Sequence, residues 1–188
     1  SSNGTVVCLL NGAFKPHKPG QTYRKSRGLV VLDAFNYPSF TDFADQYDFT
    51  GIEPFTMVCI EQGSTQRTIY ELKWDGQKTH NYEHDANQRH LWASASLYRE
   101  EAQKQRRQLF LEWHQLQEQI QWQGLKAVHE QLKMGAFETD LLADGAKPPV
   151  DTLSITGIEC GSDKLTMRYL DLRAVKETLA EMALNIGE

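Results

Sequence analysis

The chain lacks the features that mark membrane, disulfide-rich and nucleic-acid-binding proteins. Its longest uninterrupted apolar runs are about five residues, whereas a membrane-spanning helix needs roughly 20. It has only three cysteines in 188 residues, and its formal net charge is −5. A negative protein is repelled by the phosphate backbone of nucleic acids. We therefore expect neither a membrane nor a nucleic acid among its partners.

The motifs of common cofactor and nucleophile sites are absent as well. No P-loop, dinucleotide-binding fingerprint, GxSxG elbow or CxxC pair occurs. Histidines remain as candidate metal ligands, but the residues around His80 and His84 do not favour the helix that would place those two on one face. We expect no cofactor, no metal site, and structural or surface roles for four histidines: His17, His80, His84 and His90.

Each cysteine lies within an apolar, strand-like run. Such residues are typical small members of a protein core, and the cytoplasm keeps them reduced. We therefore expect Cys8, Cys59 and Cys160 to be buried and unpaired in a cytoplasmic protein. Cys8 has an alternative interpretation as a nucleophile, which its apolar neighbours and the lack of a nearby base do not favour.

The remaining composition is that of an ordinary globular domain, with 40% apolar and 24% charged residues. One domain over residues 1–188 has enough length for a sizeable core. Short apolar or alternating runs between turn residues predict strands over residues 5–11, 55–61, 68–74, 80–84, 153–160 and 164–170.

Helices are expected in three regions between these strands and in one region after them. The run 29–35 has a strand-like composition, but Ser26 can cap a helix there and Pro38 lies just beyond its end. Residues 39–47 predict a second short helix. The segment 99–133 is rich in good helix formers and carries two apolar sets, so it predicts two helices or one bent helix.

The last segment, residues 172–184, has apolar residues at helical spacing and predicts an amphipathic helix. Grouped helices and hairpins then favour an α+β fold with two packed, mostly antiparallel sheets between helix layers, not a doubly wound sheet.

The beginning of the chain is unusual. Residues 1–4 have the composition of a turn, and residues 5–12 continue directly into a buried strand. Because a hairpin turn normally has a strand on each side, we expect a strand to be missing before Ser1. The sheet would then carry an open edge, covered by another chain: the missing segment or a second copy.

Two groups of polar residues are candidates for a site. Asn11 ends the first strand beside Gly12, where its amide can turn into a cleft and donate to an oxyanion; a simple turn role is the alternative. A basic loop over residues 15–27, including Arg24 and Arg27, is either a solvated loop or an anion-binding rim. Small residues such as Ser94 leave room beside the backbone, so Ser94 is a candidate for the wall of a pocket.

Five segments in order resemble the NRDE family, the bacterial relatives of the transport and Golgi organization protein. They cover the chain from residue 4 to about residue 171. The segments are Val7–Phe14 with Tyr23–Gly28, Gly51–Thr56, Leu72–Gly76, His90–Ser94 and Thr152–Thr156.

The resemblance implies an N-terminal-nucleophile hydrolase fold, an αββα sandwich, of which this chain is the larger C-terminal part. Members usually begin with Met-Cys, and the Cys becomes the nucleophile once it is residue one. Asn11 matches the oxyanion-type Asn, and Ser94 falls where another Asn is common. Residues 149–151, Pro-Val-Asp, replace a frequent Arg.

Two functions follow from the resemblance. One is hydrolysis of a non-peptide C–N bond in a small amide, with Asn11 and Ser94 at the catalytic centre and Asn11, Arg24, Arg27 and Trp92 holding the substrate. The other is binding or trafficking of a small molecule such as haem. Ser1 is a second candidate nucleophile, although we expect it to lie at a truncation boundary and this chain to be inactive. A third interpretation is an α+β domain with an interaction role.

Overall fold

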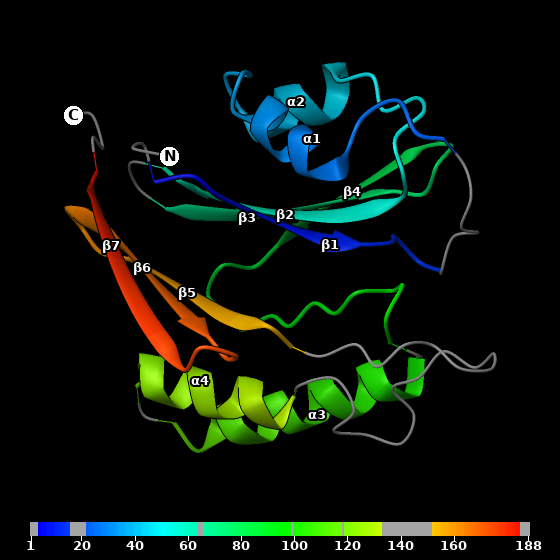
Figure 1. Ribbon diagram of the computed structural model, residues 1–188. Coiled ribbons are helices and arrows are strands. Elements are labelled where there is room, and N and C mark those ends of the chain that lie inside the picture. Colours follow the sequence, from blue (N-terminus) through cyan, green and yellow to red (C-terminus); the bar gives the residue numbers. More distant parts are fainter. Residues whose placement is uncertain are drawn as a thin grey trace. The chain divides into compact units, whose positions relative to one another are not determined.

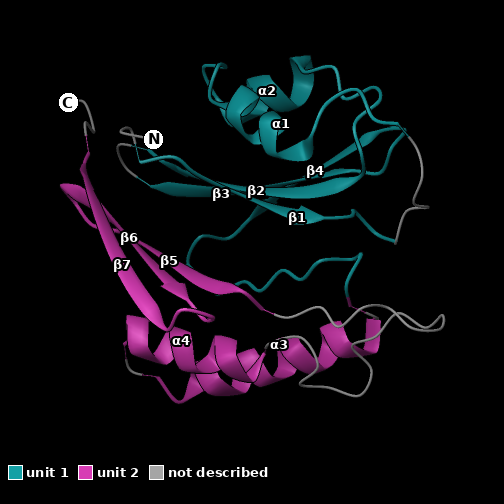
Figure 2. Cartoon of the chain, in the orientation of Figure 1, with its two compact units in different colours: residues 1–97, 185–188 teal, residues 98–184 magenta. Residues whose placement is uncertain are grey.

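The computed structural model describes residues 4–15, 22–63, 66–98, 100–117, 119–132 and 152–184. The chain divides into two compact units, residues 1–97 with 185–188 and residues 98–184, coloured separately in Figure 2. Within the described residues the fold is mixed α and β, with four helices and two antiparallel sheets. None of the described helices has the length and apolar character needed to cross a membrane.

Unit 1 is a four-stranded antiparallel sheet in the order β1-β2-β3-β4, with two helices on one face (Figure 1). Its elements, in chain order, are β1 (Val6–Asn11), α1 (Arg27–Ala34), α2 (Phe40–Gln46), β2 (Phe55–Gln62), β3 (Arg67–Trp74) and β4 (Thr79–His84). The strands and helices predicted for this part of the sequence are therefore confirmed, and β1 lies at a sheet edge as expected.

Both helices begin where the sequence offers a cap. Ser26 Oγ accepts a hydrogen bond from Gly28 N, and Ser39 Oγ accepts one from Asp42 N. These bonds satisfy backbone donors that the first helical turn leaves unpaired. The helices then bury an aromatic-rich core against β2 and β3, in which Phe43, Phe55 and Leu72 have no exposed surface.

The two faces of the unit 1 sheet differ because side chains alternate along a strand. Phe55, Met57 and Cys59 of β2 face the helices and are fully buried. Cys8 of β1 pairs with Val58 and lies on the opposite face, where it is exposed. The expectation that every cysteine is buried is thus wrong for Cys8, and Cys160 is only half-buried.

Unit 2 contains two helices and a three-stranded antiparallel sheet in the order β5-β6-β7. The elements are α3 (Glu100–Gln115), α4 (Trp122–Gln131), β5 (Ser154–Cys160), β6 (Lys164–Asp171) and β7 (Lys176–Ala183). The segment 99–133 thus forms two helices, and the break precedes Gly124, which lies inside α4.

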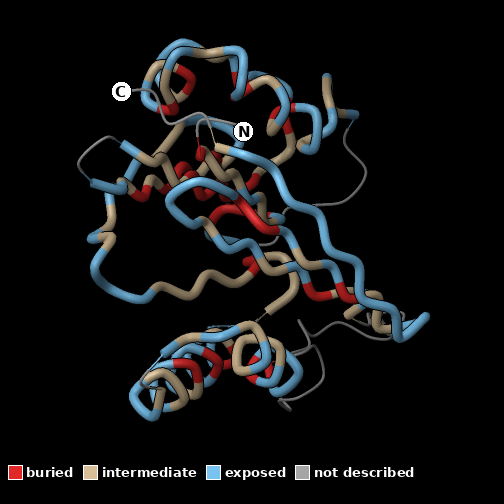
Figure 3. Tube along the Cα trace, turned by 90° about the vertical axis from the view of Figure 1, so that its left-hand side faces the viewer, coloured by how far each residue is buried: buried red, intermediate tan, exposed pale blue. Residues whose placement is uncertain are grey.

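The predicted helix over residues 172–184 is wrong, because this segment forms β7. Asp171 Oδ1 accepts hydrogen bonds from the backbone N–H groups of Arg173 and Ala174, which tightens the turn after β6. The chain then pairs with β6 over eight residues, with Lys164 Nζ 2.7 Å from Glu181 Oε1. All eight β7 residues are exposed, as the pale blue tube in Figure 3 shows. A helix here would lose this backbone pairing.

Candidate small-molecule site at the end of strand β1

The end of β1 is held in place by two distant segments of the chain. Ser94 Oγ donates a hydrogen bond to the backbone oxygen of Asn11 at 2.7 Å, and Ser96 N approaches the same oxygen at 3.4 Å. Gly12 N donates to Pro54 O at 3.1 Å, and Thr56 Oγ1 donates to Gly12 O at 2.9 Å. The backbone around Asn11 is therefore fixed on both sides.

Gly12 is required for this arrangement. Its φ of 80° lies in the left-handed region, and a Cβ atom at this position would stand 2.5 Å from Ser96 Oγ. Only glycine combines that backbone conformation with the close approach of the 94–96 segment. The Asn-Gly pair thus turns the chain sharply while leaving the Asn11 side chain exposed.

The Asn11 side chain lines an open pocket of about 460 Å³. Its amide has no hydrogen-bond partner among the residues that the structure describes. The pocket lies where the chain enters α1, and its other lining residues are Leu9, Tyr23, Lys25, Ser26, Arg27, Gly28 and Glu53. We expected the basic loop to lie beside Asn11. The described part of that loop does so, since Tyr23 and Lys25 to Arg27 line the same pocket.

The cations of this pocket are positioned by acidic partners. Arg27 Nη2 lies 3.1 Å from Glu53 Oε2, and Arg27 Nη1 donates to Pro54 O at 3.0 Å. Lys25 Nζ contacts Asp33 Oδ2, which also accepts a hydrogen bond from Tyr47 Oη at 2.7 Å. The contacts with Lys25 and then Tyr47 lower the pKa of Asp33 below its ordinary value.

Three residues expected at the site lie elsewhere or act differently. Arg24 Nε donates to Thr50 O at 3.0 Å, so its guanidinium braces the loop over residues 48–50 and does not line the Asn11 pocket. Ser94 holds the Asn11 backbone and does not line the pocket either. Trp92 belongs to a second cluster, on the sheet face opposite the helices.

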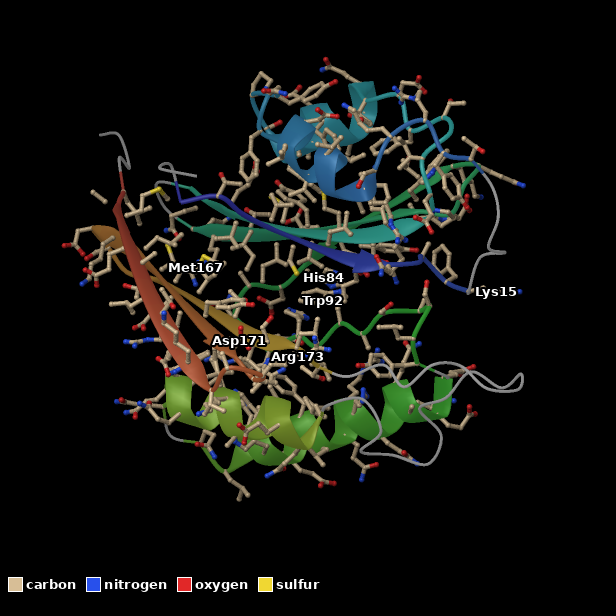
Figure 4. The ribbon with its side chains drawn as sticks, in the orientation of Figure 1. Lys15, His84, Trp92, Met167, Asp171 and Arg173 are labelled. Atoms are coloured by element: carbon tan, nitrogen blue, oxygen red, sulfur yellow. The ribbon has the colours of Figure 1, made fainter. Side chains whose placement is uncertain are left out.

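That second cluster is centred on Glu71, which no pattern in the sequence marks as a site residue. Glu71 lies in β3 and is only 5% exposed, which is unusual for a charged side chain. Its Oε2 lies 2.8 Å from His84 Nε2, and its Oε1 lies 3.0 Å from Lys73 Nζ. The His84 and Trp92 rings lie 5.5 Å apart, centroid to centroid, and Figure 4 labels both. Only the β3–β4 register brings Glu71 beside His84.

Three of the four histidines considered as metal ligands contact a protein oxygen through Nε2. His84 and His80 each bind a single carboxylate, Glu71 and Asp75, and His90 Nε2 contacts Asp85 O at 2.8 Å. No group of three or more potential ligands gathers among the described residues. His17, Ser1 and residues 149–151 lie outside the described residues.

The Asn11 pocket can hold and polarise a ligand by its geometry. It offers a free amide donor and two cationic side chains on a fixed backbone. Its lining holds neither a cysteine nor a histidine among the described residues, and its Ser26 hydroxyl is used as the α1 cap. A scan against models of known protein families and a search of curated proteins found no match to this chain.

Proposed function

We propose that the pocket at the end of β1 binds a small molecule through a hydrogen bond from the Asn11 amide to a carbonyl oxygen. The observation that carries this proposal is the exposed, unpartnered Asn11 side chain on a backbone held by Ser94 and Gly12. A preorganised donor costs little to align when a ligand arrives, so its hydrogen bond contributes more to binding.

The chemistry of the lining suggests a polar acyl compound. Leu9 and Tyr23 supply apolar surface, whereas Lys25 and Arg27 add positive charge at one side. One acidic residue, Glu53, also lines the pocket and pairs with Arg27. A small N-acyl compound with a carboxylate matches this set, because its carbonyl faces an amide donor and its carboxylate can accept a further hydrogen bond from Lys25, whose ammonium has three donors and also contacts Asp33.

We propose that the chain is a relative of the NRDE family. Two antiparallel sheets and two pairs of helices are the parts that an αββα sandwich requires. In an active member, the Asn11 amide would stabilise the oxyanion formed when a nucleophile attacks the bound amide carbon. The described lining of the pocket supports binding more directly than hydrolysis, because it contains no nucleophile with an adjacent base.

Binding is tested by titrating the chain with N-acetylglycine and with N-acetylglycinamide, and following the Asn side-chain NH₂ signals by NMR. We expect N-acetylglycine to shift the Asn11 signals. Asn11→Ala should weaken binding about fivefold to tenfold, the effect of about 1 kcal/mol for one lost hydrogen bond. Asn36→Ala is the control, since Asn36 is an exposed asparagine after α1 that does not line the pocket. Equal affinity of both variants would refute the role of Asn11.

Hydrolysis is tested separately on the same compounds. We expect no turnover from this chain. Turnover that disappears in Ser1→Ala would identify Ser1 as a nucleophile and would replace the binding proposal with an enzymatic one.

A further inference from the structure

A second pocket lies within unit 2, between helix α4 and the β5–β6 hairpin. Its volume is about 430 Å³, within the usual range of small-molecule sites. Figure 1 shows α4 lying against this sheet, and the pocket is lined by the first turn of α4 together with both strands. All of its lining residues belong to unit 2, so it is independent of the Asn11 pocket.

Gly157 creates the apolar part of this pocket. The Trp122 ring lies so close to the sheet that a Cβ atom on Gly157 would stand 2.5 Å from one ring carbon and 2.7 Å from another. The indole therefore lies directly on the β5 backbone, with Ile120 and Leu125 also in the pocket wall. This surface matches the apolar body of a ligand.

Arg168 supplies the charge. It pairs with Gly157 in the β5–β6 register and lines the same pocket. Its Nε is buried and has no hydrogen-bond partner among the described residues. Its Nη1 lies 3.6 Å from Glu177 Oε1, beyond normal hydrogen-bond length, and both side chains are more than a third exposed, which makes this a weak pair. The guanidinium therefore retains donors for a ligand.

Backbone donors lie at the same end of the pocket. Gln121 precedes α4 without making a side-chain cap, and the first hydrogen bond within the helix is from Leu125 N to Gln121 O. Among the residues that the structure describes, the N–H groups of the first turn have no other acceptor, so they remain available to a ligand. Glu159 also lines the pocket, so a single negative charge is favoured over the two charges of a phosphate.

We propose that this pocket binds a small monocarboxylic acid with an aromatic body, its ring against Trp122 and its carboxylate on Arg168. The carboxylate accepts hydrogen bonds from the planar guanidinium, which is the geometry in which arginine binds such groups best. This site is separate from the proposed function, and neither depends on the other.

The probe is phenylacetate, titrated into the intact chain while the Trp122 indole N–H signal is followed by NMR. Phenylacetamide keeps the ring but removes the charge, and acetate keeps the charge but removes the ring. We expect phenylacetate to shift the Trp122 signal and to bind about tenfold more tightly than either compound. Equal affinity of phenylacetate and phenylacetamide, or no shift of Trp122, would overturn the proposal.

Two variants locate the site. Arg168→Gln should weaken phenylacetate binding about tenfold, whereas Arg173→Gln, in the exposed turn before β7, should leave it unchanged. Gln123→Glu adds a negative charge at the pocket, in the first turn of α4. Acidic residues stabilise the start of a helix, so this variant should fold well. Its charge should repel the carboxylate and weaken phenylacetate binding. Gln77→Glu adds the same charge outside the pocket and is its control. Unchanged binding in folded Arg168→Gln and Gln123→Glu would refute the assignment.

Discussion

His84 Nε2 lies 2.8 Å from Glu71 Oε2 and joins β4 to a carboxylate that is almost fully buried. Lys73 holds the other carboxylate oxygen at 3.0 Å. Burial by itself raises the pKa of Glu71, but the contacts with His84 and Lys73 outweigh it and lower the pKa below the ordinary 4.5. The ionised carboxylate therefore belongs to the folded state.

The first prediction concerns the pH dependence that follows from Glu71. A carboxyl with a lowered pKa stabilises the fold above its unfolded pKa, and this contribution disappears as the pH falls through its folded pKa. Glu71→Gln should lower the free energy of unfolding by about 3 kcal/mol near neutral pH, because it leaves the Lys73 ammonium without its counter-charge and removes the carboxylate oxygen beside His84 Nε2. Urea unfolding of both proteins, measured from neutral pH to below 4.5, should show the difference shrinking with acid. Glu83→Gln, exposed on β4, is the control. The same difference at every pH would contradict the prediction.

The second prediction concerns Gly12 at the end of β1. Gly12→Ala combines a left-handed backbone with a contact of 2.5 Å to Ser96 Oγ, and should destabilise the protein by about 2–3 kcal/mol. Gly28→Ala is the matched control, since the nearest atom to the added methyl group is Ser26 Oγ at 3.7 Å. Alanine in that helical position should stabilise by about 0.5–1 kcal/mol. Calorimetry would reveal the opposite signs, and a shift of the same sign in both variants would refute the argument.

The third prediction concerns Val175, in the turn between β6 and β7. Its φ is 51°, a conformation that β-branched residues rarely adopt, and its side chain is 84% exposed, so little packing compensates. Val175→Gly or Val175→Asn should raise the free energy of unfolding by about 1 kcal/mol. Ala174→Gly, one residue earlier and without a positive φ, should lower it or leave it unchanged. Thermal unfolding in which Val175→Gly is the less stable protein would argue against a left-handed residue here.

The fourth prediction concerns the thiols. Burial, followed by the nearby Glu61, raises the pKa of Cys59 to about 12, and its side chain is inaccessible. Desolvation also raises the pKa of Cys8, but the Cys8 residue is exposed, so iodoacetamide should label Cys8 slowly in the native protein and Cys59 only after denaturation. Peptide mapping by mass spectrometry distinguishes the two sites. Labelling of Cys59 before Cys8 would mean that the faces of the unit 1 sheet are assigned the wrong way round.

Local signals in the sequence predicted much of the secondary structure. Ser26 and Ser39 mark helix starts because a side-chain oxygen can satisfy nearby backbone donors without any help from tertiary structure. The hairpin over residues 154–171 follows from two strand-like runs around a short turn. Asn11 is a candidate site residue on the same kind of local signal, a polar residue beside Gly12 at the end of an apolar strand, and the structure places it in the lining of a pocket.

Other features were decided by contacts between residues far apart in the chain. The 172–184 segment has helical spacing, yet its backbone pairs with β6, and spacing alone does not count the hydrogen bonds gained from a neighbouring strand. Glu71 meets His84 only through the register of β3 and β4, and Ser94 meets Asn11 across 83 residues. Sequence patterns describe which faces and turns a segment prefers. Which side chains share a site depends on the strand register and on where each loop brings the chain back to the sheet. Both are settled only once the chain has folded.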